Sequence, residues 1–274
     1  MSSRSRVARR RSRTTRSRRP WKKIALVAAV AVALPLAAVV AFLVLSRSGD
    51  EPPGPPRAVI VDQLSLTAPN PNFAARATEM LEAAGYEVDY VPGEEVTVDY
   101  YRELPTHNYE IVLLRAHAAA LELADDDYGE EVSLFTSERV SANKYAREER
   151  ERLLKGVGFS REQMEAGELY YGIPSGFVRE SMKGDFDGAK VVLMGCDVLR
   201  AQNMAEAFID KGADAVVGWD APVSASHTDA ATLSLLQYML EEQLPIQEAA
   251  AAAMAELGPD PFFDSVLLSY PPEA

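Results

Sequence analysis

The feature that most constrains this chain is an uninterrupted apolar stretch near its N-terminus. Residues 24–45 contain no charged side chain, and a helix of about 20 such residues can cross the hydrocarbon core of a bilayer. Residues 1–48 hold twelve Lys and Arg and no Asp or Glu. Because positive charge stays on the cytoplasmic side, we expect residues 1–23 to form a basic cytoplasmic arm, residues 24–45 a transmembrane helix, and the rest an extracytoplasmic domain.

A cleaved signal peptide is the alternative interpretation of this stretch. Signal peptides have a shorter apolar region that ends at small residues, whereas residues 42–45 remain apolar after the small-residue site at 39–41. Residues 17–23 also loosely resemble a twin-arginine export signal. All three interpretations place the following domain outside the cytoplasm. Residues 46–56 form a Pro-rich linker, so the folded domain begins near Arg57.

The remainder of the chain is strongly acidic. Of the 28 basic and 41 acidic side chains, residues 49–274 carry 16 and 41, which gives a formal charge of −25. Such a domain does not bind nucleic acid through its phosphates. It attracts basic ligands and cations, or it is simply well solvated.

Hydrophobic patterning predicts a single α/β domain over residues 57–274. Apolar runs predict strands at residues 58–61, 111–114, 191–194 and 215–219, and alternation of polar and apolar residues predicts a strand at 87–91. Helical periodicity predicts helices over residues 73–84, with Asn72 as N-cap, and over 98–104, 203–211, 233–240 and 245–257. This order predicts a mainly parallel sheet with helices on both faces. Residues 118–189 interrupt it, and we expect there an insertion over the sheet edge, with a hairpin near 133–140 and a charged helix near 146–154.

Four of the predicted strands end in polar residues: Asp62, His117, Cys196 and Asp220. In open α/β sheets, ligands bind beyond the carboxyl ends of the strands. Cys196 is the only cysteine, so it forms no intramolecular disulfide and no zinc site on its own. A nucleophilic thiol needs a base that removes its proton and then protonates the leaving group. The pattern predicts a dyad of His117 and Cys196, although each residue alone also fits a structural role at a strand end.

Residues 189–257 resemble the C-terminal half of caspase-like cysteine peptidases, of the CHAT type in particular. The resemblance lies in the strand that runs into Gly195 and Cys196, and in the segments 204–208, 211–219, 229–232 and 248–249. His117 stands in the place of the family's histidine. The resemblance covers most of residues 57–270 and is weaker before His117. It implies a caspase-like fold and cysteine peptidase chemistry, in which Cys196 attacks the scissile carbonyl and His117 moves the protons.

The sequence departs from the family's pattern at two points. Many members have glycine after the histidine, and its backbone N–H helps to hold the oxyanion; here the residue is Ala118, which still carries an N–H. The residues beside Cys196 also differ from the caspase pentapeptide. Inactive relatives exist in this fold family, so the fold by itself does not establish an activity.

Four further residues are expected to bind substrate: Asp220, Trp219, Asp62 and Arg115. The resemblance places the loop at residues 220–228 beside the pocket for the residue before the cut, where the Asp220 carboxylate would select Arg or Lys. The alternatives are that Asp220 caps the loop, that Trp219 packs in the core, and that Arg115 pairs with Asp62 or a site carboxylate.

The other two histidines are ranked below His117. His227 lies in the loop after the strand at residues 215–219 and is the alternative base for the thiol. His107 lies in a predicted turn, and we expect it to be structural.

These observations predict a membrane-anchored, extracytoplasmic cysteine endopeptidase of caspase-like type. Its partners would be a peptide or protein substrate, with a basic residue before the cut, and the membrane through the N-terminal helix. We expect no cofactor and no metal. The alternative is a non-catalytic binding or sensory module on the same fold at the cell surface. A third hypothesis is a hydrolase that uses a carboxylate pair such as Asp62 and Asp220.

Overall fold

The computed structural model describes residues 54–121 and 131–272. The chain divides into two units, Met1–Gly54 and Pro55–Ala274, and the described helices and strands belong to the second. The predicted basic arm, transmembrane helix and most of the linker lie outside the described residues. Within the described part, every helix is too short or too polar to span a bilayer.

A six-stranded sheet forms the centre of the domain, in the order β10-β9-β8-β3-β1-β2. Five strands are parallel, and β10 pairs antiparallel to β9. The strands are β1 Arg57–Asp62, β2 Glu87–Pro92, β3 Ile111–Arg115, β8 Lys190–Leu193, β9 Ala215–Trp219 and β10 Leu267–Tyr270. The prediction of a mainly parallel sheet is confirmed, whereas β10 was not expected.

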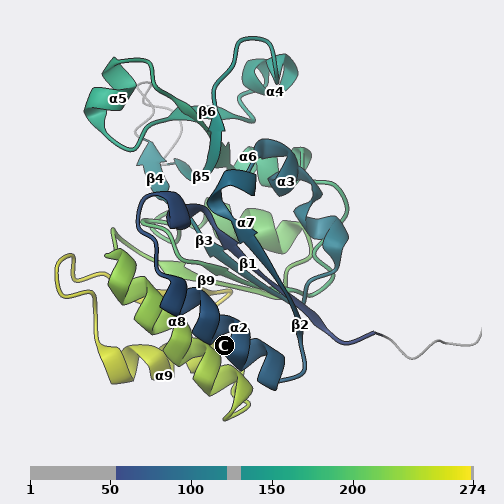
Figure 1. The fold of residues 1–274 in the computed structure, drawn as a ribbon, viewed down its shortest axis with the longest axis vertical. Coiled ribbons are helices and arrows are strands. Elements are labelled where there is room, and N and C mark those ends of the chain that lie inside the picture. The colour runs from purple at the N-terminus through teal and green to yellow at the C-terminus, as the bar shows by residue number, and fades with distance from the viewer. Residues whose placement is uncertain (1–53, 122–130, 273–274) are drawn as a thin grey trace, which may run out of the picture. The chain divides into compact units, whose positions relative to one another are not determined.

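Helices cover both faces of this sheet, as predicted. One face, which includes Ile60, Leu113 and Val217, packs against α2 Pro71–Ala83, α8 Ala225–Leu240 and α9 Ile246–Leu257. The opposite face packs against α3 Val98–Glu103, α6 Ser175–Glu180 and α7 Asn203–Asp210. Figure 1 shows α2, α8 and α9 side by side on one side of the sheet. Burial on both faces explains why the central strands β1, β3, β8 and β9 carry continuous apolar runs instead of alternating.

The insertion forms a second, antiparallel sheet in the order β4-β5-β7-β6. Its strands are β4 Ala118–Leu121, β5 Glu131–Arg139, β6 Lys155–Val157 and β7 Tyr170–Pro174, and it carries α4 Ala146–Arg150 and α5 Arg161–Glu165. The predicted hairpin near residues 133–140 is wrong, because β5 runs on as one strand there. β4 starts at Ala118, so the second sheet (upper part of Figure 1) begins immediately after His117.

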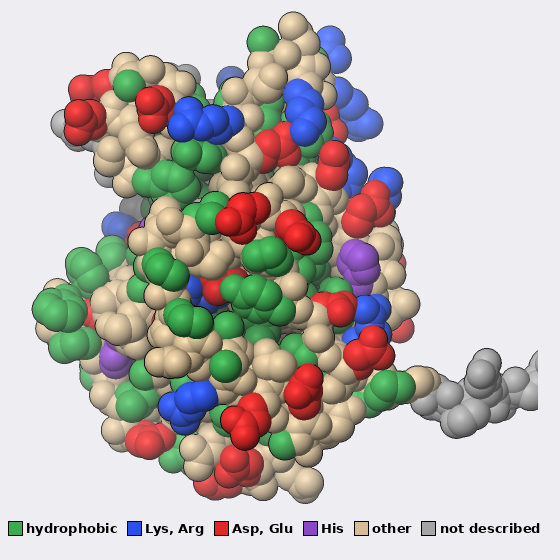
Figure 2. Space-filling model, in the orientation of Figure 1, with side chains coloured by type: hydrophobic (Ala, Val, Ile, Leu, Met, Phe, Trp, Pro, Cys, Tyr) green, Lys and Arg blue, Asp and Glu red, His purple; other side chains and the backbone are tan. Residues whose placement is uncertain are grey.

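Charged side chains are unevenly distributed on the visible face of the domain. Figure 2 shows Asp and Glu scattered over the whole visible face, from the upper left lobe to the lower end, while several Lys and Arg gather at the upper right, near α4.

Candidate active site

His117 and Cys196 lie just beyond the carboxyl ends of two neighbouring parallel strands. β3 pairs with β8 so that Leu114 is opposite Leu193, and the two candidate residues each follow three positions later. Both line one pocket of about 140 Å³, whose other residues are Leu64, Ala68, Ala116, Met194, Gly195, Val223, Ala225 and Thr228. The structure therefore brings the predicted nucleophile and base into a single cavity.

Gly195 allows the two strand ends to approach each other. A Cβ atom at this position would lie 2.7 Å from the Ala116 carbonyl oxygen and 2.7 Å from the Ala118 Cβ. These contacts are shorter than real Cβ atoms make, and one of them is to backbone, which cannot rotate away. Only glycine lets the segment that carries Cys196 pack against the segment that carries His117.

The Cys196 thiol is half-buried and contacts backbone. The Val223 N–H donates to Sγ at 3.4 Å, and Sγ lies 3.7 Å from the Val223 carbonyl oxygen. Burial raises the pKa of the thiol, the Val223 backbone opposes this, and the carboxylates of Asp197 and Asp260 raise the pKa further. Cys196 is therefore a protonated thiol at neutral pH, and its activation requires a base.

The His117 side chain is held on several sides. Its Nε2 lies 2.9 Å from Thr67 Oγ1, and its ring packs against Phe135 and Phe159. Its backbone N–H donates to Gln63 Oε1 at 3.0 Å. Burial, followed by the nearby charge of Arg115, lowers the pKa of the imidazole. His117 is therefore neutral at pH 7 and able to accept a proton, with its ring fixed in place by Thr67.

The Ala118 N–H points away from the second sheet. The Phe135 N–H donates to the His117 carbonyl at 2.9 Å, whereas the His117 N–H donates to Gln63, so only one of the two bonds of a hydrogen-bonded pair forms here. Ala118 is opposite Leu134 in the next pair, and in this register the Ala118 N–H faces away from β5. β4 is an edge strand of this sheet, and the Ala118 nitrogen faces Gly195. This amide is therefore directed towards the backbone beside Cys196.

The arrangement combines a neutral imidazole with a protonated thiol. Between these two residues of the described chain no direct hydrogen bond is formed, since the ring bonds to Thr67 and the thiol to Val223. The thiol therefore keeps its proton in the free protein, and proton transfer from Cys196 to His117 would accompany attack on a bound carbonyl.

We expect alkylation of Cys196 by iodoacetamide to be slow at pH 7 and to accelerate only at alkaline pH. The folded pKa is raised, so the reactive thiolate appears at a higher pH in the folded chain than in the same chain unfolded in urea. Because Cys196 is the only cysteine, the mass of the intact protein reports the reaction without ambiguity. A midpoint below that of the unfolded chain would instead indicate a preformed thiolate–imidazolium pair.

Arg115 and Asp62 belong to a buried ion cluster. The Arg115 side chain has no exposed surface. It donates from Nη1 to Asp62 Oδ1 at 2.7 Å, from Nε to Asp229 Oδ1 at 2.7 Å, and from Nη2 to Asp229 Oδ2 at 2.9 Å and to the Ala68 carbonyl. Arg115 thus pairs with Asp62, as one alternative predicted. Neither Arg115 nor Asp62 lines the pocket, so the structure does not place them against substrate as expected. Arg115 instead holds the loop of Ala68, which does line the pocket.

Trp219 is fully buried, so it contributes to the site through Thr228. Its indole N–H donates to Thr228 Oγ1 at 2.9 Å, and this hydroxyl donates to the Met194 carbonyl at 3.1 Å. Trp219 therefore packs in the core, which was the alternative prediction, because a side chain without exposed surface cannot touch a substrate. Asp220 Oδ1 accepts the Val266 N–H at 2.8 Å. That bond joins Asp220 to the segment before β10, so it is not the predicted cap of the loop at residues 220–228. Asp220 does not line the pocket, and its preference for a basic substrate residue stays a prediction.

The other two histidines lie outside the pocket. His227 Nε2 is 3.2 Å from the Gly258 carbonyl oxygen, and its ring packs against Trp219. His107 stacks between Tyr100 and Tyr109, which is a structural role. His117 is therefore the histidine that the fold brings to Cys196.

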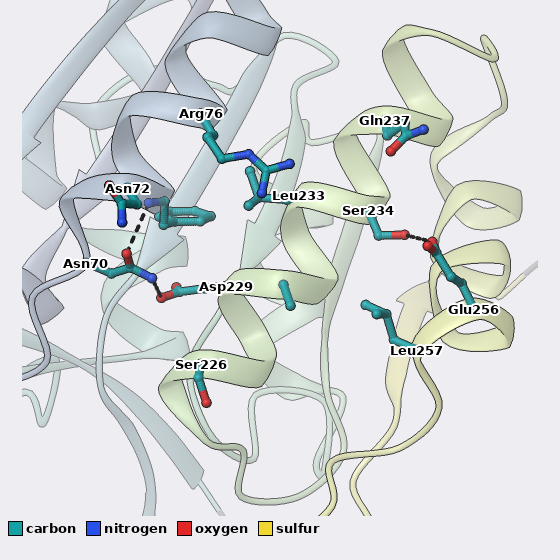
Figure 3. Close-up of a pocket in the computed structure, with 12 residues that line it drawn as sticks. Asn70, Asn72, Arg76, Ser226, Asp229, Leu233, Ser234, Gln237, Glu256 and Leu257 are labelled. Atoms are coloured by element: carbon teal, nitrogen blue, oxygen red, sulfur yellow. Dashed lines mark hydrogen bonds between the residues drawn. The ribbon is translucent and has the colours of Figure 1, made fainter.

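A larger pocket, of about 440 Å³, lies over α8 between α2 and α9. Arg76 extends from α2 towards α8, and the Ser234 hydroxyl donates to Glu256 of α9 (Figure 3). At one end Asn70 donates to Asp229 at 2.9 Å, so this pocket shares Asp229 with the ion cluster. It contains no cysteine or histidine and is separate from the dyad.

Sequence patterns did not identify Thr67, Gln63, Val223 or Phe159 as neighbours of the dyad. Thr67 and Gln63 follow β1 at the same sheet edge as His117, so their position after a strand was an available signal. Phe159 lies in the insertion, between β6 and α5, and its approach to His117 depends on pairing between distant strands, which no local sequence pattern reveals.

Neither the known protein-family models nor the curated proteins include a match to this chain. Among the residues that the structure describes, no three His, Cys, Asp or Glu side chains are grouped as metal ligands.

Proposed function

We propose that residues 57–274 form a caspase-like domain that acts as a cysteine endopeptidase with His117 and Cys196 as its dyad. The observation that carries the proposal is the meeting of the only cysteine and a neutral, half-buried imidazole in one pocket at the carboxyl ends of adjacent parallel strands. In α/β sheets this edge is the usual place for catalysis.

The chemistry follows from the positions of three groups. Cys196 Sγ bonds to the scissile carbonyl carbon as His117 takes the thiol proton, and the Ala118 N–H binds the oxygen that becomes negative. When the C–N bond breaks, His117 gives the proton to the departing amine. Water activated by His117 then hydrolyses the thioester and releases Cys196 as a thiol. The resting protonation states support this order, in which the base acts during attack.

The proposal includes a location and a specificity. The apolar stretch at residues 24–45 would anchor the chain in the cell membrane, with the domain on the extracytoplasmic side. Asp220 would favour Arg or Lys before the cut, by a charge-assisted pair with its carboxylate. The Val266 N–H occupies Oδ1, so Oδ2 would take the substrate cation.

A peptidyl acyloxymethyl ketone, an electrophile that alkylates active-site thiols, tests these points together. We expect a version ending in Arg to label Cys196 faster than versions ending in Asp or Leu, and His117→Ala to slow the labelling. Asp220→Asn should erase the preference for Arg, with a loss of roughly thirtyfold to several thousandfold. A membrane-impermeant form should label the full chain on intact cells. Fastest labelling by the Asp or Leu version would refute the preference for a basic residue before the cut, but it would not contradict the dyad of His117 and Cys196.

A non-catalytic peptide-binding module is the second candidate. The raised pKa of Cys196 favours it, because a protonated thiol is a weak nucleophile. In that case the electrophile would react no faster than iodoacetamide does, and its reaction would not depend on His117.

A further inference from the structure

An aromatic cluster from the second sheet covers one side of the His117 ring. The ring of Phe159, between β6 and α5, is centred 5.1 Å from that of His117, and the ring of Tyr170, on β7, is centred 4.8 Å from Phe159. The ring of Phe135 completes the cluster, centred 5.9 Å from that of His117 and 5.4 Å from that of Phe159. Phe135 is buried, whereas Phe159 and Tyr170 are only half-buried. The rings thus extend from the imidazole to the surface.

The backbone that carries Phe159 is fixed by the start of α5. Ser160 Oγ accepts the Gln163 N–H at 3.2 Å, and Gln163 Oε1 accepts the Phe159 N–H at 3.2 Å. This reciprocal pair satisfies two amides at the helix start. Phe159 is therefore held against His117 by local hydrogen bonds, and no ligand is needed to place it.

The outer end of the cluster is polar. The Arg139 guanidinium lies over the Tyr170 ring, 5.4 Å from its centre, and pairs with Glu168 at 3.8 Å. The accessible apolar surface therefore ends after two rings. This width suits one large apolar side chain and is too small for the apolar face of a helix or for a lipid surface.

We propose that Phe159 and Tyr170 form an apolar wall that receives a large apolar side chain of the polypeptide substrate, close to the scissile bond. The inference rests on the proposed function, because the His117 imidazole must reach the reacting atoms. A ring centred 5.1 Å from that imidazole then contacts a substrate residue within one or two positions of the cut. The second sheet would thereby add a subsite to the dyad that the main sheet supplies.

Peptide binding to the full chain with Cys196→Ala tests the wall without requiring turnover. The probe is a positional library of fluorescein-labelled decapeptides in a Gly/Ser background with one Phe or Ala, measured by fluorescence polarisation. We expect one register in which Phe binds roughly 10- to 100-fold more tightly than Ala. Adding Phe159→Ala should remove that advantage, and Tyr170→Ala should reduce it.

Two further variants exclude a general loss of folding. Phe159→Leu keeps an apolar side chain and should retain most of the advantage. Val140→Ala shortens another exposed apolar residue of the insertion, which directly follows β5 and is 38% exposed, and it should leave the advantage of Phe over Ala unchanged. The wall is refuted if no register prefers Phe, or if Phe159→Ala and Tyr170→Ala leave the ratio of Phe to Ala affinity unaltered. Peptidase activity is judged separately, by hydrolysis with Cys196 present, so failure of one proposal is distinguishable from failure of the other.

Discussion

Cys196→Ala is expected to lower kcat/KM for peptide hydrolysis by roughly 10⁴- to 10⁶-fold, the range for loss of a catalytic nucleophile. The thiol lines the pocket with His117, and the sequence contains no second cysteine that could replace it. The fold should survive the change, because the half-buried sulfur bonds only to the Val223 backbone. We expect a stability loss of about 1 kcal/mol, measured by urea denaturation.

Two histidine variants identify the base. His117→Ala should lower the rate by roughly 10²- to 10⁴-fold, as expected for loss of a general base. His227→Ala is the matched control, because His227 lies at the Gly258 carbonyl and outside the pocket, and it should leave the rate unchanged. If His227→Ala removed activity while His117→Ala retained it, the assignment of the base would be wrong.

Arg115→Met is expected to destabilise the domain by about 3–5 kcal/mol. The substitution removes the cation between Asp62 and Asp229 and leaves two carboxylates in sites that are only 1% and 4% exposed. Uncompensated charge in such surroundings is costly, and the loss is a large fraction of the roughly 5–15 kcal/mol by which domains are stable. Urea denaturation followed by circular dichroism measures it.

Two comparisons separate buried charge from lost packing. Arg147→Met breaks an exposed pair with Glu151, whose side chains are 70% and 47% exposed, and should cost under about 1 kcal/mol. Adding Asp62→Asn and Asp229→Asn to Arg115→Met should recover part of the stability, because no unpaired carboxylate remains. A loss below about 1 kcal/mol for Arg115→Met would show that the cluster is not a structural element.

The four central strands of the main sheet, β1, β3, β8 and β9, were predictable because each contains a short run of apolar residues buried on both faces. The runs at residues 58–61, 111–114 and 215–219 all lie within observed strands. The helix over residues 73–84 was also correct, but its N-cap is Asn70 instead of Asn72. Pro71 occupies the first turn, where proline is favoured, and this places the cap one residue before it.

Pairing between distant segments was not predictable. β5 pairs with β7, about 35 residues later, and neither strand carries a turn signal that joins them. β10 is a four-residue strand that pairs antiparallel with β9 at the sheet edge. Its assignment depends on the partner strand, which local pattern does not reveal.

The sequence located the candidate site but not the division of roles within it. Polar residues after four strands pointed to one sheet edge, and the structure places His117 and Cys196 there in one pocket. Whether Asp62, Arg115 and Trp219 face the pocket or the core depends on their contacts with other segments of the chain. Asp229, which accepts two of the hydrogen bonds from the Arg115 side chain, lies 114 positions away in sequence.

The most direct test of the dyad is the mass of the protein during turnover. The full chain is mixed with a peptide substrate, quenched in acid within seconds, and examined by intact-protein and peptide-level mass spectrometry. We expect a thioester on Cys196 that carries the N-terminal part of the substrate, and no such adduct in Cys196→Ala. Hydrolysis that continues in Cys196→Ala, with no adduct in the wild type, would contradict the assignment of Cys196 as the nucleophile.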